Sequence, residues 1–599
     1  MAERFLAIFH PDRPLPSFPN DAFVAAAAAL GLRSVLRRSN LVVLADFALN
    51  AIPFADDHGV ILGSLFSRDA ETNTGAVGEI GEAITASRGQ LLIDRYWGRY
   101  VALMISPSDG ALHVLRDPSG GIAVFKFCFR GATVITSEIR LAIELGLINP
   151  QISWPHVAEF LTYRNLRATA TCLDGVDELI AGCCWSFQAG KTDMRCLWSP
   201  WTYASPDRYI TDFDEAVELL RAETRRCVSA LASQHGNVLL ELSGGLDSSV
   251  LAACLRGQDV SVSAVTFATA GGDGDEREYA RAAATAAGLP LREIVYQGQS
   301  IDMTQSRVDY APRPNARAAM QPVERAFMDA AALAGSDAFM SGAGGDNVLC
   351  YLSSAAPAAD LLRGRIHPRL FLSAILDLAS MHQDTVWRAS RLAVKKAWRA
   401  GQQPLWRAET GFLAADAITY LPPAHPWLDG SKRTLPGKWE QVHSMMVIQM
   451  YLDGHERQGR GPIIFPFLSQ PVMELALRIP TWLWIVGGQN RSVARQAFSD
   501  SLPHEVRSRR TKGGLASLCA AMFDENRTIL RPFLLEGQLA SAGLLERDAI
   551  DAFLSREGPS KDDMLYRILT IVDAEAWART WRVPDHSGTI EDIVATAST

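Results

Sequence analysis

The chain has 599 residues, too many for a single hydrophobic core, so we expect two or more domains. Its net charge of -8 argues against nucleic acid as the main partner, and its 48% hydrophobic and 21% charged residues are typical of a globular protein. No apolar run approaches the roughly 20 residues of a membrane span, and the start shows no secretory signal, so we expect a cytoplasmic protein without nucleic acid or membrane as a partner.

The first 200 residues predict layered antiparallel sheets, an α+β sandwich. Helices are expected at 21–31 and 138–146, and a Pro- and Trp-rich stretch at 198–210 indicates a domain boundary near residue 205. Short apolar runs broken by turn residues lie at 4–10, 41–47, 59–66, 100–106, 111–117, 122–129 and 183–190.

The pattern changes after that boundary. A long amphipathic helix is predicted at 212–233, and the chain from about 355 to 585 is predicted to be mainly helical, with loops at 420–440 and 454–470. Between them, strands alternate with helices, which predicts an α/β fold with a parallel sheet and crossover helices. The expected strands lie at 237–243, 262–268, 291–296 and 337–342, and the helices start at Asp247, at 275 and near 323.

A glycine- and serine-rich turn, "SGGLDSS", follows the first of these strands. Glycines let backbone N–H groups approach an anion, hydroxyls add donors, and the start of a helix favours negative charge, so the turn is typical of a phosphate site. It lacks the lysine of a Walker loop. An aspartate inside a phosphate cradle makes sense if it holds Mg²⁺ against the phosphates. The candidate ligands are Ser243, Gly244, Gly245, Leu246, Asp247, Ser248 and Ser249.

A second turn of the same kind, "SGAGGDN", follows the strand at 337–342 and contains Ser341, Gly344 and Asp346. Together the two turns resemble the pyrophosphate (PP) loop and the SGxGxD segment of ATP-pyrophosphatases of the asparagine-synthetase branch. That resemblance implies cleavage of ATP to AMP and pyrophosphate, and Mg²⁺ held by Asp247 and Asp346. It also implies an adenine pocket at the end of the second strand, near Phe267.

The resemblance covers most of the chain. The stretches 97–105 and 112–127 are similar to the family's N-terminal-nucleophile (Ntn) glutaminase, and 465–480, 490–498 and 502–514 resemble its later segments. It therefore implies a degenerate glutamine amidotransferase-like domain at 1–205. An asparagine synthetase-like domain with extra helices and a short C-terminal tail would follow at 206–599.

The N-terminal residues depart from the glutaminase pattern. The family's domain begins Met-Cys-Gly, with the cysteine as nucleophile. This chain begins Met1, Ala2, Glu3, and its first cysteine is Cys128. We therefore expect no glutamine hydrolysis, and a different amine must attack the activated carboxyl group.

Two branches of the family use an amine of the same molecule: the β-lactam synthetases and the lasso peptide cyclases. Asparagine synthetases carry Glu, and β-lactam synthetases Tyr, where this chain has Ala343. The amino-acid sequences of the segments at 342–347, 466–471 and 487–495 look most like those of the lasso cyclases. This likeness implies adenylation of an Asp or Glu side chain of a precursor peptide and macrolactam closure on its N-terminal amine. A leader-binding recognition protein and a leader peptidase would be partners.

Alternatives remain open at this stage. One is an ammonia-dependent asparagine synthetase or a β-lactam synthetase-like ligase. Another, of a different class, is a non-catalytic ATP-binding scaffold in a peptide-processing complex. Modification of a nucleic acid fits the loop family but not the acidic charge.

Candidate catalytic residues lie late in the chain. Lys512 matches the family's late lysine and would stabilise developing charge, while Arg491 and Arg495 are one turn apart and could face the phosphates. For the base we favour Glu456, with Asp453 and His455 in the same loop as alternatives. The carboxylates Asp275, Glu276 and Glu278 are interpreted as a helix N-terminus rather than as ligands.

One basic stripe lies outside these motifs. Arg388, Arg391, Lys395 and Arg399 would share one side of a helix. A solvated helix face is the usual explanation, and docking of an acidic partner, such as a peptide-delivery protein or protease, is the alternative.

Overall fold

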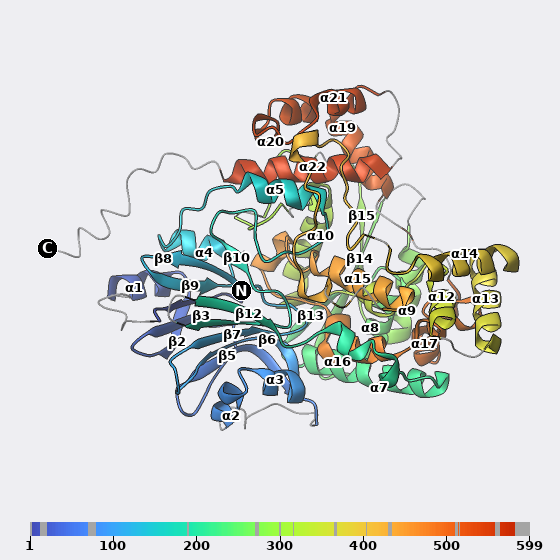
Figure 1. Cartoon of the computed structure of the whole chain (residues 1–599), viewed down its shortest axis with the longest axis horizontal. Coiled ribbons are helices and arrows are strands. Elements are labelled where there is room, and N and C mark those ends of the chain that lie inside the picture. The colour runs from blue at the N-terminus through green and yellow to red at the C-terminus, as the bar shows by residue number, and fades with distance from the viewer. Residues whose placement is uncertain are drawn as a thin grey trace.

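The computed structural model has an antiparallel N-terminal part and a parallel-sheet C-terminal part (Figure 1). None of the helices it describes is both long and apolar enough to cross a bilayer. It describes residues 3–11, 21–69, 80–188, 191–269, 275–298, 301–308, 310–314, 317–364, 368–402, 404–428, 430, 434–509, 513, 516–556 and 563–581.

The N-terminal part is a sandwich of two six-stranded sheets in which all strand pairs are antiparallel. Alternate apolar residues of both sheets, such as Phe5, Val43 and Leu103, interleave in a buried core. The first sheet has the order β10 (Asp177–Glu178), β8 (Phe125–Phe129), β9 (Ala132–Thr136), β1 (Phe5–Phe9), β3 (Leu41–Asp46), β2 (Leu32–Arg37). The second has the order β12 (Lys191–Cys196), β11 (Cys183–Gln188), β7 (Leu112–Arg116), β6 (Tyr96–Ile105), β5 (Gly59–Ser67), β4 (Ala51–Pro53). The predicted antiparallel layers are confirmed.

The C-terminal part contains one parallel sheet. Its order is β15 (Leu291–Tyr296), β14 (Ser261–Thr269), β13 (Asn237–Glu241), β16 (Ala338–Met340), β17 (Ile463–Ile464). The four predicted strands are all present. The short edge strand β17 lies within the stretch expected to be a loop, because two residues are too few to give a periodic signal.

Helices surround both parts (Figure 1). The predicted helices at 21–31 and 138–146 are present, slightly shortened. In the N-terminal part and the connection they are α1 (Asp21–Ala29), α2 (Gly81–Ala86), α3 (Gln90–Arg95), α4 (Ile139–Glu144), α5 (Trp154–Thr162) and α6 (Pro200–Tyr203). Those of the C-terminal part are α7 (Phe213–Ala232), α8 (Leu246–Leu255), α9 (Arg277–Ala287), α10 (Gln321–Ala334), α11 (Gly345–Val348), α12 (Ala356–Arg363), α13 (Pro368–His382), α14 (Val386–Arg399), α15 (Pro436–Gln449), α16 (Gln470–Arg478), α17 (Ser492–Ala497), α18 (His504–Ser508), α19 (Ala516–Leu535), α20 (Gln538–Ser541), α21 (Arg547–Leu554) and α22 (Asp563–Thr580).

The central strand β13 is covered on both faces. Val238 and Leu240 pack with residues of α8 and α9, whereas Leu239 packs with α10 on the other face. The chain runs from β13 outward to β14 on one side and returns to β16 on the other side. The strand order therefore reverses between β13 and β16, which is where open parallel sheets bind ligands.

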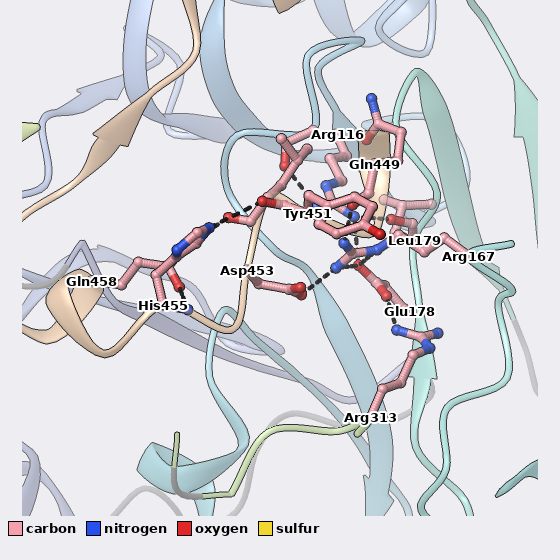
Figure 2. A network of polar contacts seen from close by, with 12 residues as sticks. Arg116, Arg167, Glu178, Leu179, Arg313, Gln449, Tyr451, Asp453, His455 and Gln458 are labelled. Carbon is pink, nitrogen blue, oxygen red and sulfur yellow. Dashed lines mark hydrogen bonds and ion pairs between the residues drawn. The ribbon is translucent and has the colours of Figure 1, made fainter. Parts of the chain in front are cut away.

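A cluster of buried charges joins the two parts (Figure 2). Glu178 of β10 accepts hydrogen bonds from Arg116 at 2.8 Å, from Arg167 at 2.9 Å, and from Arg313 of the C-terminal part. Arg167 also bonds Asp453 at 2.5 Å, in the loop after α15. Burial alone would raise the pKa of Glu178, but the three guanidinium groups lower it far below its usual value.

Asp360 of α12 makes stability depend on pH. Its buried carboxyl group accepts hydrogen bonds from Gly437 N–H and the Thr481 hydroxyl, both at 2.6 Å, and burial raises its pKa to about 7. An unfolded aspartate titrates near pH ~4, so the native state keeps a proton that the unfolded chain releases between about pH 4 and pH 7. The stabilisation is fully present below about pH 4 and is lost as the pH rises through 7.

We expect the Asp360→Asn variant to show a flatter pH dependence of the free energy of unfolding than the parent. The difference should be about 1 kcal/mol per pH unit between pH 4 and pH 7. Urea unfolding at several pH values measures it, with the exposed Asp259→Asn as control. If the free energies of unfolding of the parent and of Asp360→Asn changed in parallel from pH 4 to pH 7, Asp360 would be ionised in the folded protein over this whole range.

Candidate nucleotide-binding site

A cavity of about 490 Å³ lies at the point where the strand order reverses. Its walls come from the loop after β13, the end of β14, α10, the loop after β16 and the segment around α17. Ten of the residues predicted as ligands or catalytic groups line it: Ser243, Gly245, Leu246, Asp247, Ser248, Phe267, Gly344, Asp346, Arg491 and Arg495. Gly244 and Ser249, of the same loop as Ser243, are not among the lining residues.

The first loop is shaped by its own small residues. The Ser243 hydroxyl lies 3.2 Å from that of Ser248 and accepts a hydrogen bond from Gly245 N–H at 3.3 Å. Gly244 adopts a φ of +74°, and a Cβ there would lie 2.5 Å from the backbone nitrogen of Ala280 in α9. The loop can therefore turn sharply into α8 at Leu246 only with glycine at this position.

The two loops touch because both are glycine-rich at their contact. A Cβ on Gly342 would lie 2.8 Å from Ser248 N, and one on Gly345 would lie 2.4 Å from the carboxyl carbon of Asp247. Glycine thus lets the second loop press against the first. This close approach brings Asp247 and Asp346 to the same corner of the cavity.

The two carboxylates converge on one cationic nitrogen. Arg491 Nη1 donates to the Asp247 oxygens at 2.8 and 3.0 Å, and it also donates to Asp346 Oδ1. Burial alone would lower the pKa of Arg491, but the two carboxylates raise it above its usual value. The backbone φ of Arg491 is +53°, a left-handed conformation that costs a non-glycine residue roughly 1 kcal/mol. The corner is therefore built to hold a positive charge.

The same corner fits a magnesium ion. Two carboxylates that meet a single cationic nitrogen can also meet a cation, and Mg²⁺ is commonly held by one or two carboxylates plus phosphates and retained waters. No group of three or more His, Cys, Asp or Glu among the described residues is arranged as a complete metal cage.

Arg495 lines the cavity, but its hydrogen bonds go to the chain itself. Its guanidinium donates to Asn490 O at 2.9 Å, Arg507 O at 2.6 Å and Arg509 O at 3.0 Å. Burial, helped by nearby Arg491, lowers its pKa to about 10. Arg495 therefore holds the segment after α18 against the cavity, whereas the Arg491 guanidinium is directed to Asp247 and Asp346.

Lys512 lies outside the described residues, but Arg509 and Gly513, on either side of it in the sequence, are described. Glu276 bonds Arg509 Nη2 at 2.5 Å and accepts a hydrogen bond from Gly513 N–H at 2.9 Å, and all three residues line the cavity. The sequence suggested a helix N-terminus for Glu276. It does precede α9, yet its side chain makes no capping hydrogen bond and anchors this loop instead.

We expect Glu276→Gln to raise the KM for ATP about tenfold, because the charge-assisted bond that holds Arg509 at the wall of the cavity is weakened. Pyrophosphate release measured against ATP concentration tests this. Glu278→Gln, an exposed carboxylate two residues away, is the matched control. An unchanged KM for Glu276→Gln would show that the loop does not contribute to nucleotide binding.

The three candidate bases do not line this cavity. Asp453, His455 and Glu456 line a second cavity of about 280 Å³ between the two parts of the chain. Asp453 bonds Arg167, as Figure 2 shows. His455 Nδ1 lies 3.0 Å from Glu324.

The carboxylate that does reach the nucleotide cavity at this side is Glu241, at the end of β13. It contacts Arg457 at 2.5 Å and accepts a hydrogen bond from the Ser341 hydroxyl at 2.9 Å. The sequence assigns Glu241 to the strand. The one sequence signal for its place at the cavity is its position shortly before the glycine-rich turn.

Comparison with known proteins agrees with the geometry. The asparagine synthase family model matches residues 219–579, more than half of the chain. No curated protein sequence matches significantly.

Two solved structures show weak likeness. One is titled as the allosteric regulatory enzyme of purine biosynthesis (8% identity, 49% of this chain, 80% of that chain, TM-score 0.23). The other is glutamine phosphoribosylpyrophosphate amidotransferase from B. subtilis with ADP and GMP (8% identity, 49% of this chain, 69% of that chain, TM-score 0.21). Scores this low add nothing to the strand and helix arrangement described above. The family match and the two glycine-rich loops at one cavity lead to the same conclusion: the chain belongs to the asparagine synthase family, whose members are ATP-dependent amide-forming ligases.

Proposed function

We propose that the protein is a lasso peptide cyclase, which joins a side-chain carboxyl group of a precursor peptide to the peptide's own N-terminal amine at the expense of ATP. The observation that carries the ATP-dependent part is the convergence of Asp247 and Asp346 on Arg491 beside the glycine-rich loop. The peptide specificity rests on the resemblance of the segments at 342–347, 466–471 and 487–495 to lasso cyclases.

In the first step the peptide carboxylate attacks the α-phosphorus of ATP. The bond to the β-phosphate oxygen breaks, pyrophosphate leaves, and an acyl-adenylate remains. The loop at 243–249 would bind the phosphates, and Arg491 would stabilise the negative charge of the departing pyrophosphate. Asp247 and Asp346 would hold Mg²⁺, which when bound neutralises phosphate charge.

In the second step the N-terminal amine attacks the acyl carbon. The amide bond forms, AMP leaves with the electron pair of the broken C–O bond, and the amine loses a proton. The site's main contribution is confinement, since holding amine and acyl carbon in reach of each other can be worth roughly 7–11 kcal/mol. Lys512 would stabilise the charge that develops on the adenylate.

The choice of an internal amine is supported by two features. Residues 1–127 contain no cysteine, so the sandwich lacks the thiol with which the family releases ammonia from glutamine. Ala343 lines the cavity with a methyl group where related ligases have Glu or Tyr. The adenylate would therefore meet an amine brought by the substrate.

The proton acceptor is assigned to the loop that carries Asp453, His455 and Glu456. Within this loop Glu456 is the proposed base, as a carboxylate that lines the cavity between the two parts of the chain. A leader-binding recognition protein and a leader peptidase are proposed partners, since a free amine must be exposed on the peptide before the ring closes.

The decisive experiment incubates the protein with Mg·ATP and any short candidate precursor peptide encoded beside its gene, together with any neighbouring recognition protein and peptidase. We expect AMP, pyrophosphate and a peptide lighter by one water, with the new bond at an Asp or Glu side chain in fragment spectra. Asparagine formed from aspartate, ammonia and ATP would reject the cyclase. ATP binding without pyrophosphate release with the peptide would favour a non-catalytic scaffold.

A further inference from the structure

Helix α14 carries two tryptophans that project into solvent. Trp387 is 85% exposed and Trp398 is 74% exposed. Tryptophan has a large apolar side chain that is usually buried or half-buried. The helix packs against α12 and α13 through Ala389 and Ala393, which are buried. Its tryptophans therefore do not contribute to the core.

The two tryptophans lie on one line along the helix. They are eleven residues apart, which is three helical turns and a span of about 16 Å. Val394, 55% exposed, lies between them on the same line. The outer edge of α14 is thus a straight apolar ridge, which we call the Trp387–Trp398 ridge.

Cations flank this ridge. Arg391, Lys395 and Arg399 are exposed and make no ion pair within the described part of the chain, while Arg388 pairs with Asp384 at 3.2 Å and remains 63% exposed. No acidic residue occurs between 386 and 399. In a chain of net charge -8, this face is a local concentration of positive charge.

The ridge is convex and lies on an outer helix. Figure 1 places α13 and α14 at the edge of the molecule farthest from the N-terminal sandwich. Neither of the two cavities described above is lined by α14. Aromatic side chains that protrude from an outer helix can enter the interfacial region of a flat bilayer. The adjoining α13 also exposes Leu372 and Leu376.

We propose that α14 docks on an anionic lipid bilayer, with Trp387 and Trp398 in the interfacial region and the flanking cations over the headgroups. Tryptophan concentrates at membrane interfaces, and Lys and Arg beside an apolar face attract anionic lipids. The expectation of no membrane partner was based on the lack of a spanning segment, which does not bear on a helix that lies on the surface. The proposal is independent of the proposed ligase function.

Vesicle sedimentation with the full chain tests this. Wild type should partition at least about tenfold more strongly onto phosphatidylcholine vesicles with about 30 mol% phosphatidylglycerol than onto pure phosphatidylcholine. Binding should weaken when salt rises from about 0.1 to about 1 M, since the screening length falls from ~10 to ~3 Å. W387A/W398A and R391E/K395E should each lower the partition by about tenfold or more.

Matched controls separate the ridge from general effects. Tyr420→Ala removes another aromatic side chain that is 87% exposed, and K191E/R256E reverses two exposed cations elsewhere; both should bind as wild type does. Unchanged thermal melting of the α14 variants verifies that they fold.

Two results would overturn the proposal. One is wild-type binding that is absent, or insensitive to both α14 variants. The other is wild type that ignores the vesicles but binds polyglutamate through α14, which would assign the ridge to an acidic polypeptide.

Discussion

Asp247→Asn and Asp346→Asn are each expected to lower ATP-dependent pyrophosphate release by more than about a hundredfold. Even residues that only support a metal ligand cost ten- to a hundredfold when they are changed, and these two carboxylates would touch the ion directly. Asparagine keeps the shape of aspartate, so the close contact of Asp247 with Gly345 is preserved. The expected loss is therefore one of charge and not of packing.

Binding provides a second measurement. Wild type should gain thermal stability from ATP and Mg²⁺ together, and each variant should gain clearly less, because the corner that holds Arg491 loses half of its negative charge. Asp329→Asn, which removes an exposed carboxylate from α10, should behave as wild type. Full turnover by either active-site variant would exclude the shared cation site and with it the proposed reaction.

The corner itself could be predicted from sequence because its signals are local. Each loop is a glycine-rich turn at the end of an apolar strand, and the alternation of strands and helices predicts a parallel sheet. Local sequence patterns do not predict which strands lie next to each other in the sheet. The order β15–β14–β13–β16–β17 places the loops after β13 and β16 next to each other, although Asp247 and Asp346 are 99 residues apart.

Contacts between distant segments had no such signal. Arg491 was assigned to phosphates, and its place between the two carboxylates depends on its left-handed backbone and on the packing of α17. The sequence places Glu276 at a helix N-terminus because acidic residues are common in the first turn of a helix. Its bonds to Arg509 and Gly513 require a loop more than 230 residues later in the chain.

The same holds for the loop with the candidate bases. Its position just before the segment at 465–480 suggested that Asp453 and Glu456 would face the nucleotide. Arg167 instead binds Asp453 and Gln449 O, and so draws the start of this loop toward the sandwich. The N-terminal part, which is expected to have lost glutamine hydrolysis, thereby takes on a structural role at the C-terminal part.

That role leads to the second large effect: Glu178→Gln should destabilise the protein by about 3–5 kcal/mol. The Glu178 side chain is fully buried, and Arg116, Arg167 and Arg313 converge on it with 7% exposure or less. Glutamine fills the same space but leaves three buried guanidinium groups facing one another, with Asp453, bound to Arg167, as one remaining counter-charge. The penalty is that of uncompensated buried charge, which exceeds the worth of any single hydrogen bond.

Calorimetry and urea unfolding measure this effect. Because Arg116, Arg167 and Glu178 belong to the sandwich and Arg313 and Asp453 to the other part, the loss should also separate one unfolding transition into two. The control is Asp551→Asn, which breaks the exposed pair with Arg531 and should leave the midpoint unchanged. A Glu178→Gln protein as stable as its parent would mean that backbone carbonyls such as Leu179 O and Ala170 O compensate the arginines without the carboxylate.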